Sequence, residues 1–251
     1  IRDFCLARGL GDVYKRQDTV IHYAFVMPQD TSSIRLIVGL GNPGSEYEAT
    51  RHNCGFQMLD LLADKYGGRF SEDRKFSGET ARVRIEGEEI WLLKPTTFMN
   101  RSGIAVQAMA AYYKIAPEEI LIVHDELDLL PGTMKLKKGG GNAGHNGLKS
   151  ITAQLGTPDF WRLRIGIGHP RTFGWAQQVF DFVLAAPSSE HREAIRKMMQ
   201  EALVGIPLLV AGEWQKANRH FAKFGSLPKP KAEPEKTAEG KAQTKSDGEA
   251  R

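Results

Sequence analysis

Cysteine is scarce in this chain of 251 residues, which contains only Cys5 and Cys54. Two cysteines cannot build the disulfide framework of a small secreted protein or a zinc site made of thiolates. We interpret Cys54 as a small buried residue at the start of a helix. This cysteine usage predicts a reducing, cytoplasmic setting.

Long hydrophobic runs and internal repeats are also absent. No apolar segment approaches the roughly 18 residues that cross a bilayer, so we expect no membrane partner. The composition, 41% hydrophobic and 25% charged, is typical of a globular protein, and the length suffices for one domain with a sizeable core. The net charge of +4 permits a polyanionic partner without demanding one.

The two ends of the chain differ from its middle. Residues 1–26 show no clear periodicity, whereas Met27 opens a segment that reads as a natural amino terminus, so we expect 1–26 to be a non-native or upstream extension. Residues 226–251 have almost no large apolar side chains, which predicts a disordered charged tail whose lysines are nearly cancelled by acids. The folded domain is expected to span residues 27–225.

Within that domain, strand and helix patterns alternate. The expected strands are residues 34–40, 80–85, 89–93, 120–124, 134–136 and 163–167. The expected helices are residues 54–66, 100–113, 146–155, 187–210 and 213–224. This alternation predicts a single α/β domain whose mixed, mostly parallel sheet is flanked by helices on both faces.

The first motif, residues 39–44, matches the G-x-G-x-x-G pattern after a strand and is a weak signal for a dinucleotide site. In such a fold the helix opens inside the motif, whereas here Pro43 interrupts it and helical periodicity starts only after His52. Asp60, in the position of a ribose-binding acid, falls inside a helix. The competing interpretation is a hydrolase loop that brings Asn42 and His52 to the sheet edge, although either residue could instead serve the local backbone.

Two further segments place side chains just after expected strands, where they can line a crevice. In the first, Pro95 breaks a strand, and we expect residues 98–100 to face the first loop, with Thr97 or Asn100 as an alternative helix N-cap. In the second, Asp125 follows a buried strand and can orient an imidazole from the other loop, or simply form a turn. Side-chain alternation predicts that His124 points away from Asp125.

The fourth segment, residues 135–149, carries lysines into a glycine-rich loop that precedes a helix. Exposed backbone N–H groups and a helix amino terminus suit phosphate, although the spacing is not a Walker A pattern and a flexible linker is the simpler alternative. His145 and Asn146 have no metal-ligand partners at a useful spacing, so we expect no metal.

Together, these segments resemble the bacterial peptidyl-tRNA hydrolase family. The matching stretches, in the family's order, are VGLGNPGSEYEATRHNCGF, KPTTFMNRSG, HDELDLLPG, GGGNAGHNGLKS and RLRIGIGHP. The resemblance covers about residues 34–224. It implies a monomeric α/β domain with a twisted sheet, similar to phosphorylase/hydrolase-like folds, and no cofactor.

The resemblance also implies an activity and its residues. The reaction would be hydrolysis of the ester bond between a peptide and tRNA, which frees the tRNA for translation. His52 is implied as the catalytic base and Asp125 as its orienting partner. The residues implied in substrate positioning and in the channel for the peptide and terminal adenosine are Asn42, Tyr47, Phe98, Met99, Asn100 and Asn146. Those implied at the acceptor-stem phosphates are Lys135, Lys137 and Arg164.

Two other function classes stay open. An RNA-binding module on the same scaffold would lack hydrolysis, although the presence of His52, Asp125 and the three asparagines favours the enzyme. A nicotinamide-dependent enzyme would require the glycine motif to hold a dinucleotide.

Overall fold

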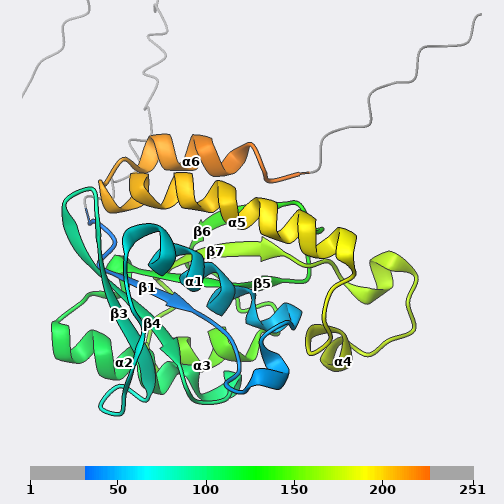
Figure 1. The fold of residues 1–251 in the computed structure, drawn as a ribbon, viewed down its shortest axis with the longest axis horizontal. Helices are drawn as coiled ribbons and strands as arrows, with labels where there is room; N and C mark the ends of the chain where they lie inside the picture. Colours follow the sequence, from blue (N-terminus) through cyan, green and yellow to red (C-terminus); the bar gives the residue numbers. More distant parts are fainter. Residues whose placement is uncertain (1–31, 227–251) are drawn as a thin grey trace, which may run out of the picture. The chain divides into compact units, whose positions relative to one another are not determined.

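The computed structural model describes residues 32–226, which form one seven-stranded sheet and the helices around it (Figure 1). The strand order is β2-β3-β4-β1-β5-β7-β6. The strands are β1 (Leu36–Gly39), β2 (Ser71–Asp73), β3 (Gly78–Ile85), β4 (Glu88–Pro95), β5 (Ile120–Glu126), β6 (Met134–Lys138) and β7 (Trp161–Gly166). The expected extension of residues 1–26 and the expected tail beyond Ser226 lie outside the described residues.

Helices cover both faces of the sheet, as the alternating pattern predicts. They are α1 (Cys54–Tyr66), α2 (Ser102–Tyr113), α3 (Asn146–Leu155), α4 (Val179–Val183), α5 (Ser189–Val210) and α6 (Trp214–Ala222). One apolar core lies between the sheet and α1, α5 and α6, and a second lies between the sheet and α2 and α3 (Figure 1). From Ser32 to Ser226, no helix has the length and apolar character needed to span a bilayer.

The sheet is mixed, which confirms the expected α/β class. Its four central strands, β4, β1, β5 and β7, run parallel, while β2, β3 and β6 pair antiparallel at the two sides. The central strands are mostly apolar because both of their faces are buried, as over residues 120–123 of β5. Since parallel strands end at the same edge, the loops after β1, β4 and β5 meet there.

The structure differs from the expected elements at several boundaries. The three-residue β2 and the five-residue α4 were not predicted, because such short segments carry too little periodicity. Strand β5 continues through Glu126, so Asp125 lies on the strand and is not a turn residue. The alternative role of Thr97 or Asn100 as an N-cap is not found: a 3-10 turn intervenes, and Arg101 precedes α2 without a side-chain cap.

Gly39 of the first motif and Gly55 of α1 allow close packing of α1 on β1. A Cβ atom on Gly39 would lie 2.3 Å from the carbonyl oxygen of Gly55, and one on Gly55 would lie 2.3 Å from the Leu40 nitrogen. Helix α1 begins only at Cys54, so its amino terminus lies outside the glycine turn. This geometry does not match the dinucleotide-binding alternative, in which the helix opens inside the motif.

We expect Gly55→Ala to reduce the free energy of unfolding by at least about 2 kcal/mol, because the added methyl group meets backbone atoms that cannot move aside. Gly141→Ala is a matched control, since no atom lies within 4 Å of the added Cβ there. Urea unfolding of both variants measures the difference. Equal stability of the two would contradict the packing argument.

Candidate active site

A cleft of about 550 Å³ opens at the edge of the sheet where β1, β4 and β5 end. It gathers all eight residues that the resemblance implies in catalysis, substrate positioning and the peptide channel: Asn42, Tyr47, His52, Phe98, Met99, Asn100, Asp125 and Asn146. The three cationic residues assigned to phosphate, Lys135, Lys137 and Arg164, are not among the lining residues.

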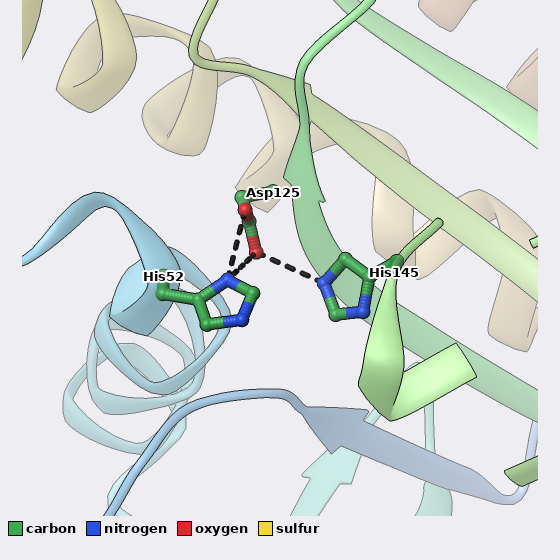
Figure 2. A group of neighbouring side chains, drawn as sticks. All are labelled: His52, Asp125 and His145. Carbon is green, nitrogen blue, oxygen red and sulfur yellow. Dashed lines mark hydrogen bonds and ion pairs between the residues drawn. The ribbon is translucent and has the colours of Figure 1, made fainter. Parts of the chain in front are cut away.

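The buried Asp125 carboxylate lines this cleft and is shared by two imidazoles (Figure 2). His52 Nδ1 lies 2.9 Å from Oδ1 and 3.0 Å from Oδ2 of Asp125. On the other side, His145 Nε2 lies 3.0 Å from the same Oδ1. Because an ionised carboxylate can only accept, both histidines donate N–H to it, and His52 keeps the lone pair on Nε2.

Burial and pairing oppose each other in the protonation of this group. Burial alone would raise the pKa of Asp125, but the two imidazoles lower it well below its ordinary value. Burial likewise lowers the pKa of His52, yet the charge of Asp125 and its hydrogen bond outweigh this effect and raise the pKa overall. The arrangement therefore gives an ionised acid beside a histidine of increased basicity.

His145 is fixed in one tautomer by its second role as the N-cap of α3. Its Nδ1 accepts hydrogen bonds from the backbone nitrogens of Gly147 at 3.1 Å and Leu148 at 3.4 Å. An accepting Nδ1 places the proton of the neutral ring on Nε2, which faces Asp125. His145 therefore serves as a fixed donor to the carboxylate.

The same three side chains, His52, Asp125 and His145, have ligand atoms within 4.8 Å of one another. The sequence-based reason for expecting no metal, the lack of partners for His145, is thus wrong, because the partners come from other strands and loops. However, His145 could lend its Nε2 lone pair to a cation only by moving the proton to Nδ1, which would break the N-cap. The donor set fits a hydrogen-bonded group better than a metal site.

His124 contacts both the Asp125 backbone and the His145 ring. It is buried, and its Nδ1 lies 2.7 Å from the backbone oxygen of Asp125. Burial and the neighbouring His145 lower the pKa of His124 to about 3, so it stays neutral near pH 7. It packs edge-on against the His145 ring, at 5.0 Å between centroids, and helps to fix the position of that ring.

Asn42 is held by both its backbone and its side chain. Its backbone N–H donates to Asn53 Oδ1, and its carbonyl accepts from Asn53 Nδ2, each at 2.9 Å. The backbone nitrogen of Met99 donates to Asn42 Oδ1 at 2.9 Å. This leaves Asn42 Nδ2 as a fixed donor, with no hydrogen-bond acceptor in the described part of the chain, on the cleft side of the loop.

Apolar side chains border the other part of the cleft. Phe98 is 60% exposed and Phe180 of α4 is 70% exposed, and both line the cleft together with Met99. The segment that carries Phe180 is tied to the histidine loop by the buried Arg51. The Nη1 atom of Arg51 donates to three carbonyl oxygens between residues 182 and 186, at 3.0 to 3.1 Å.

The basic residues gather on β6 and β7, next to the cleft. Lys135 and Lys137 are exposed on β6 and lie opposite Arg164 and Arg162 of β7. Buried Arg162 donates to the carbonyls of Gly140 and Gly141, which holds the glycine-rich loop in place and argues against a flexible linker. Arg164 differs from the lysines because its Nε donates to Glu126 Oε2 at 2.8 Å.

Sequence reasoning missed several residues that shape the site. They are Arg51, Asn53, His124, Glu126, His145, Val179, Phe180, Val183 and Leu184. His145 lies in the fourth segment, but metal ligation is the only specific role weighed for it there from the sequence. Its position directly before a helix, where a side-chain acceptor caps the backbone, was the available signal.

Comparison with known proteins identifies related chains. The family model described as "Peptidyl-tRNA hydrolase" matches residues 36–230. A peptidyl-tRNA hydrolase of Bordetella avium is 56% identical over 188 residues, which cover 75% of this chain and 91% of the relative. One of Neisseria meningitidis is 56% identical over 189 residues, covering 75% and 97%.

A solved structure agrees with the sequence relatives. The crystal structure of peptidyl-tRNA hydrolase from Acinetobacter baumannii superposes with a TM-score of 0.74 at 48% identity. The match covers 78% of this chain and 97% of that one. The similarity therefore extends over nearly the full length of the relatives.

We expect the pKa of His52, followed by NMR titration of its ring nitrogens, to lie above the ordinary value of about 6.5. In Asp125→Asn the charge is lost while burial remains, so the pKa should fall below that of the wild type. His124 should show no titration until the pH approaches about 3. An unchanged His52 pKa in Asp125→Asn would contradict the assignment of Asp125 as the cause.

Proposed function

The chain belongs to the peptidyl-tRNA hydrolase family and acts on the ester bond of peptidyl-tRNA, and within this reaction we propose that His52 is the general base. Support comes above all from the bond of 2.9 Å between His52 Nδ1 and buried Asp125. A general base needs an accessible lone pair and sufficient basicity. The pairing leaves the lone pair on Nε2 and raises the pKa of His52.

In the proposed mechanism a water molecule is the nucleophile. Neutral His52 takes a proton from water as the water oxygen attacks the ester carbonyl carbon. Asp125 holds the tautomer and stabilises the imidazolium that forms. The bond from carbon to the 3′ oxygen of the tRNA then breaks, and His52 returns the proton to that oxygen. The products are free tRNA and a peptide with a carboxyl terminus.

Direct attack by water is favoured over a covalent intermediate. Cys54 lines none of this cleft, is buried, and has a pKa raised well above its ordinary value, first by burial and then by Asp125. A neutral buried thiol is a poor nucleophile.

We further propose that Asn42 stabilises the negative charge on the tetrahedral intermediate. Its Nδ2 is fixed by the bonds to Asn53 and Met99, so it need not reorganise during the reaction. Asn100 and Asn146 line the same cleft and supply further amide groups for the substrate. Tyr47, Phe98 and Met99 offer apolar surface for the peptide and the terminal base.

The acceptor stem is proposed to lie along β6, where Lys135 and Lys137 are exposed. Contacts from lysine to phosphate position an RNA without reading its sequence, which suits an enzyme that accepts many tRNAs. An RNA-binding module without hydrolysis is not favoured, because relatives at 56% identity bear the name of the enzyme.

We also propose that the protein works as a monomer in the cytoplasm without a metal or cofactor. The cleft is built from groups of one chain, and the His145 tautomer opposes metal ligation. Sedimentation of the purified protein would test the monomer. Activity after chelation of transition metals with Mg²⁺ retained, so that the tRNA stays folded, would test the absence of a metal.

We expect His52→Ala to lower kcat/KM by about 10³-fold or more in hydrolysis of N-acetylated aminoacyl-tRNA, because the general base is lost. Binding of tRNA should change little, since His52 does not lie on β6, where the acceptor stem is proposed to bind. His220→Ala on α6 is a histidine control that should keep its activity, because its ring bonds to Glu201 outside the cleft. A nearly active His52→Ala enzyme would overturn the assignment.

For Lys137→Ala, we expect weaker tRNA binding and a salt dependence shallower by about 0.7 to 0.9 in the logarithmic slope, because one phosphate contact is lost. Binding measured over a range of KCl concentrations gives this slope. Lys197→Ala, an exposed lysine on α5, controls for net charge. Equal slopes for the two variants would count against β6 as the phosphate-binding strand.

A further inference from the structure

Arg164 differs from Lys135 and Lys137 because it is paired with an acid. Its Nε lies 2.8 Å from Glu126 Oε2, and the side chains are 20% and 5% exposed. The Nη groups of Arg164 have no hydrogen-bond partner within residues 32–226. The guanidinium therefore keeps donors for a further acceptor while a nearby carboxylate compensates its charge.

Glu126 connects this pair to the catalytic cleft. Its side chain lines the cleft, and its other oxygen, Oε1, accepts from the backbone nitrogen of Asp128 at 3.1 Å. Successive side chains along β5 point to opposite faces of the sheet. Asp125 therefore contacts His52 on one face, and Glu126 contacts Arg164 on the other. The end of β5 thus presents one acid to the catalytic base and the next acid to Arg164 of β7.

Arg164 lies where it can reach the same RNA as the lysines. In the antiparallel register it is directly opposite Lys135, so the two side chains project from the same face of the sheet. A phosphate bound by Lys135 would be near the unpaired side of the Arg164 guanidinium. The negative charge of Glu126 weakens the attraction of that guanidinium for phosphate, and it does so more strongly where burial reduces screening by water.

We propose that Glu126 limits the affinity of this enzyme for tRNA by compensating the charge of Arg164, and so favours release of the free tRNA after hydrolysis. This inference rests on the proposed placement of the acceptor stem along β6. The substrate has an extra group to hold it, the peptide in the cleft, whereas the product tRNA is held by its RNA contacts alone. A weakened phosphate contact therefore penalises the retained product without preventing binding of the substrate.

The test is Glu126→Gln, which removes the charge while keeping the shape and an oxygen that can accept from Arg164. Binding of deacylated tRNA should become about fivefold tighter, as expected for roughly 1 kcal/mol. Its salt dependence should steepen, because Arg164 now counts as a full phosphate contact. In steady-state hydrolysis, KM and kcat should both fall, since product leaves more slowly.

Glu89→Gln is the matched control. It removes the same charge from another pair of arginine and glutamate, Arg82 and Glu89, at 3.1 Å on β3 and β4. If only the net charge of the protein mattered, both variants would bind tRNA more tightly. The proposal requires the effect in Glu126→Gln alone.

A double-mutant cycle with Arg164→Gln identifies the partner. The gain from Glu126→Gln should vanish when Arg164 is absent. Unchanged tRNA affinity in Glu126→Gln, or an equal gain in both backgrounds, would overturn the proposal. Thermal unfolding verifies the fold of each variant. Glu126→Asp, too short to keep the ion pair but still charged, provides a second variant and should gain affinity less than Glu126→Gln.

These binding measurements use deacylated tRNA and need no turnover, so they are independent of the assignment of His52. Failure of the wild-type protein to hydrolyse N-acetylated aminoacyl-tRNA would contradict the proposed mechanism. Failure of Glu126→Gln to change tRNA binding, with wild-type hydrolysis intact, would contradict only the role of Glu126.

Discussion

The buried carboxylate of Asp125 is the constraint on which the site depends. A charge in the interior is costly unless donors surround it, and here His52 and His145 supply them from opposite sides. Each donor is itself positioned by another element: His52 by the loop after β1, and His145 by its bonds to the start of α3. The requirement to satisfy one acid therefore fixes the relative positions of three chain segments.

The sequence predicted the parts of the site that depend on strand ends. Asn42 and Asp125 each end or follow an apolar run, and the common edge of parallel strands brings such residues together. Arg51 was missed because its role depends on carbonyl oxygens more than 130 residues along the chain. His145 was missed although its place directly before α3 is a local signal for an N-cap. Helix α4 was missed because five residues show no measurable period, although the cleft takes much of its apolar wall from it.

The glycine motif shows why local pattern alone was ambiguous. The same spacing can bring a backbone close to a pyrophosphate or bring a helix close to a strand, and both uses exclude a side chain. The contacts of Gly39 and Gly55 show that the glycines here bring a helix close to a strand. Because that packing sets where α1 begins, it also places His52, in the turn just before the helix, next to Asp125. Gly39 and Gly55 thus affect the catalytic site indirectly, because the backbone packing they allow positions His52.

Strand β5 joins the catalytic chemistry to RNA binding through simple alternation. Asp125 and Glu126 are consecutive, so their carboxylates leave the strand on opposite faces and are held by different partners, His52 and Arg164. A cation on a surface for RNA gains affinity from every phosphate it holds, but an enzyme that must release RNA gains nothing from unlimited affinity. Placing an acid behind Arg164 lowers the attraction without removing the guanidinium, whose directional donors can still orient the phosphate.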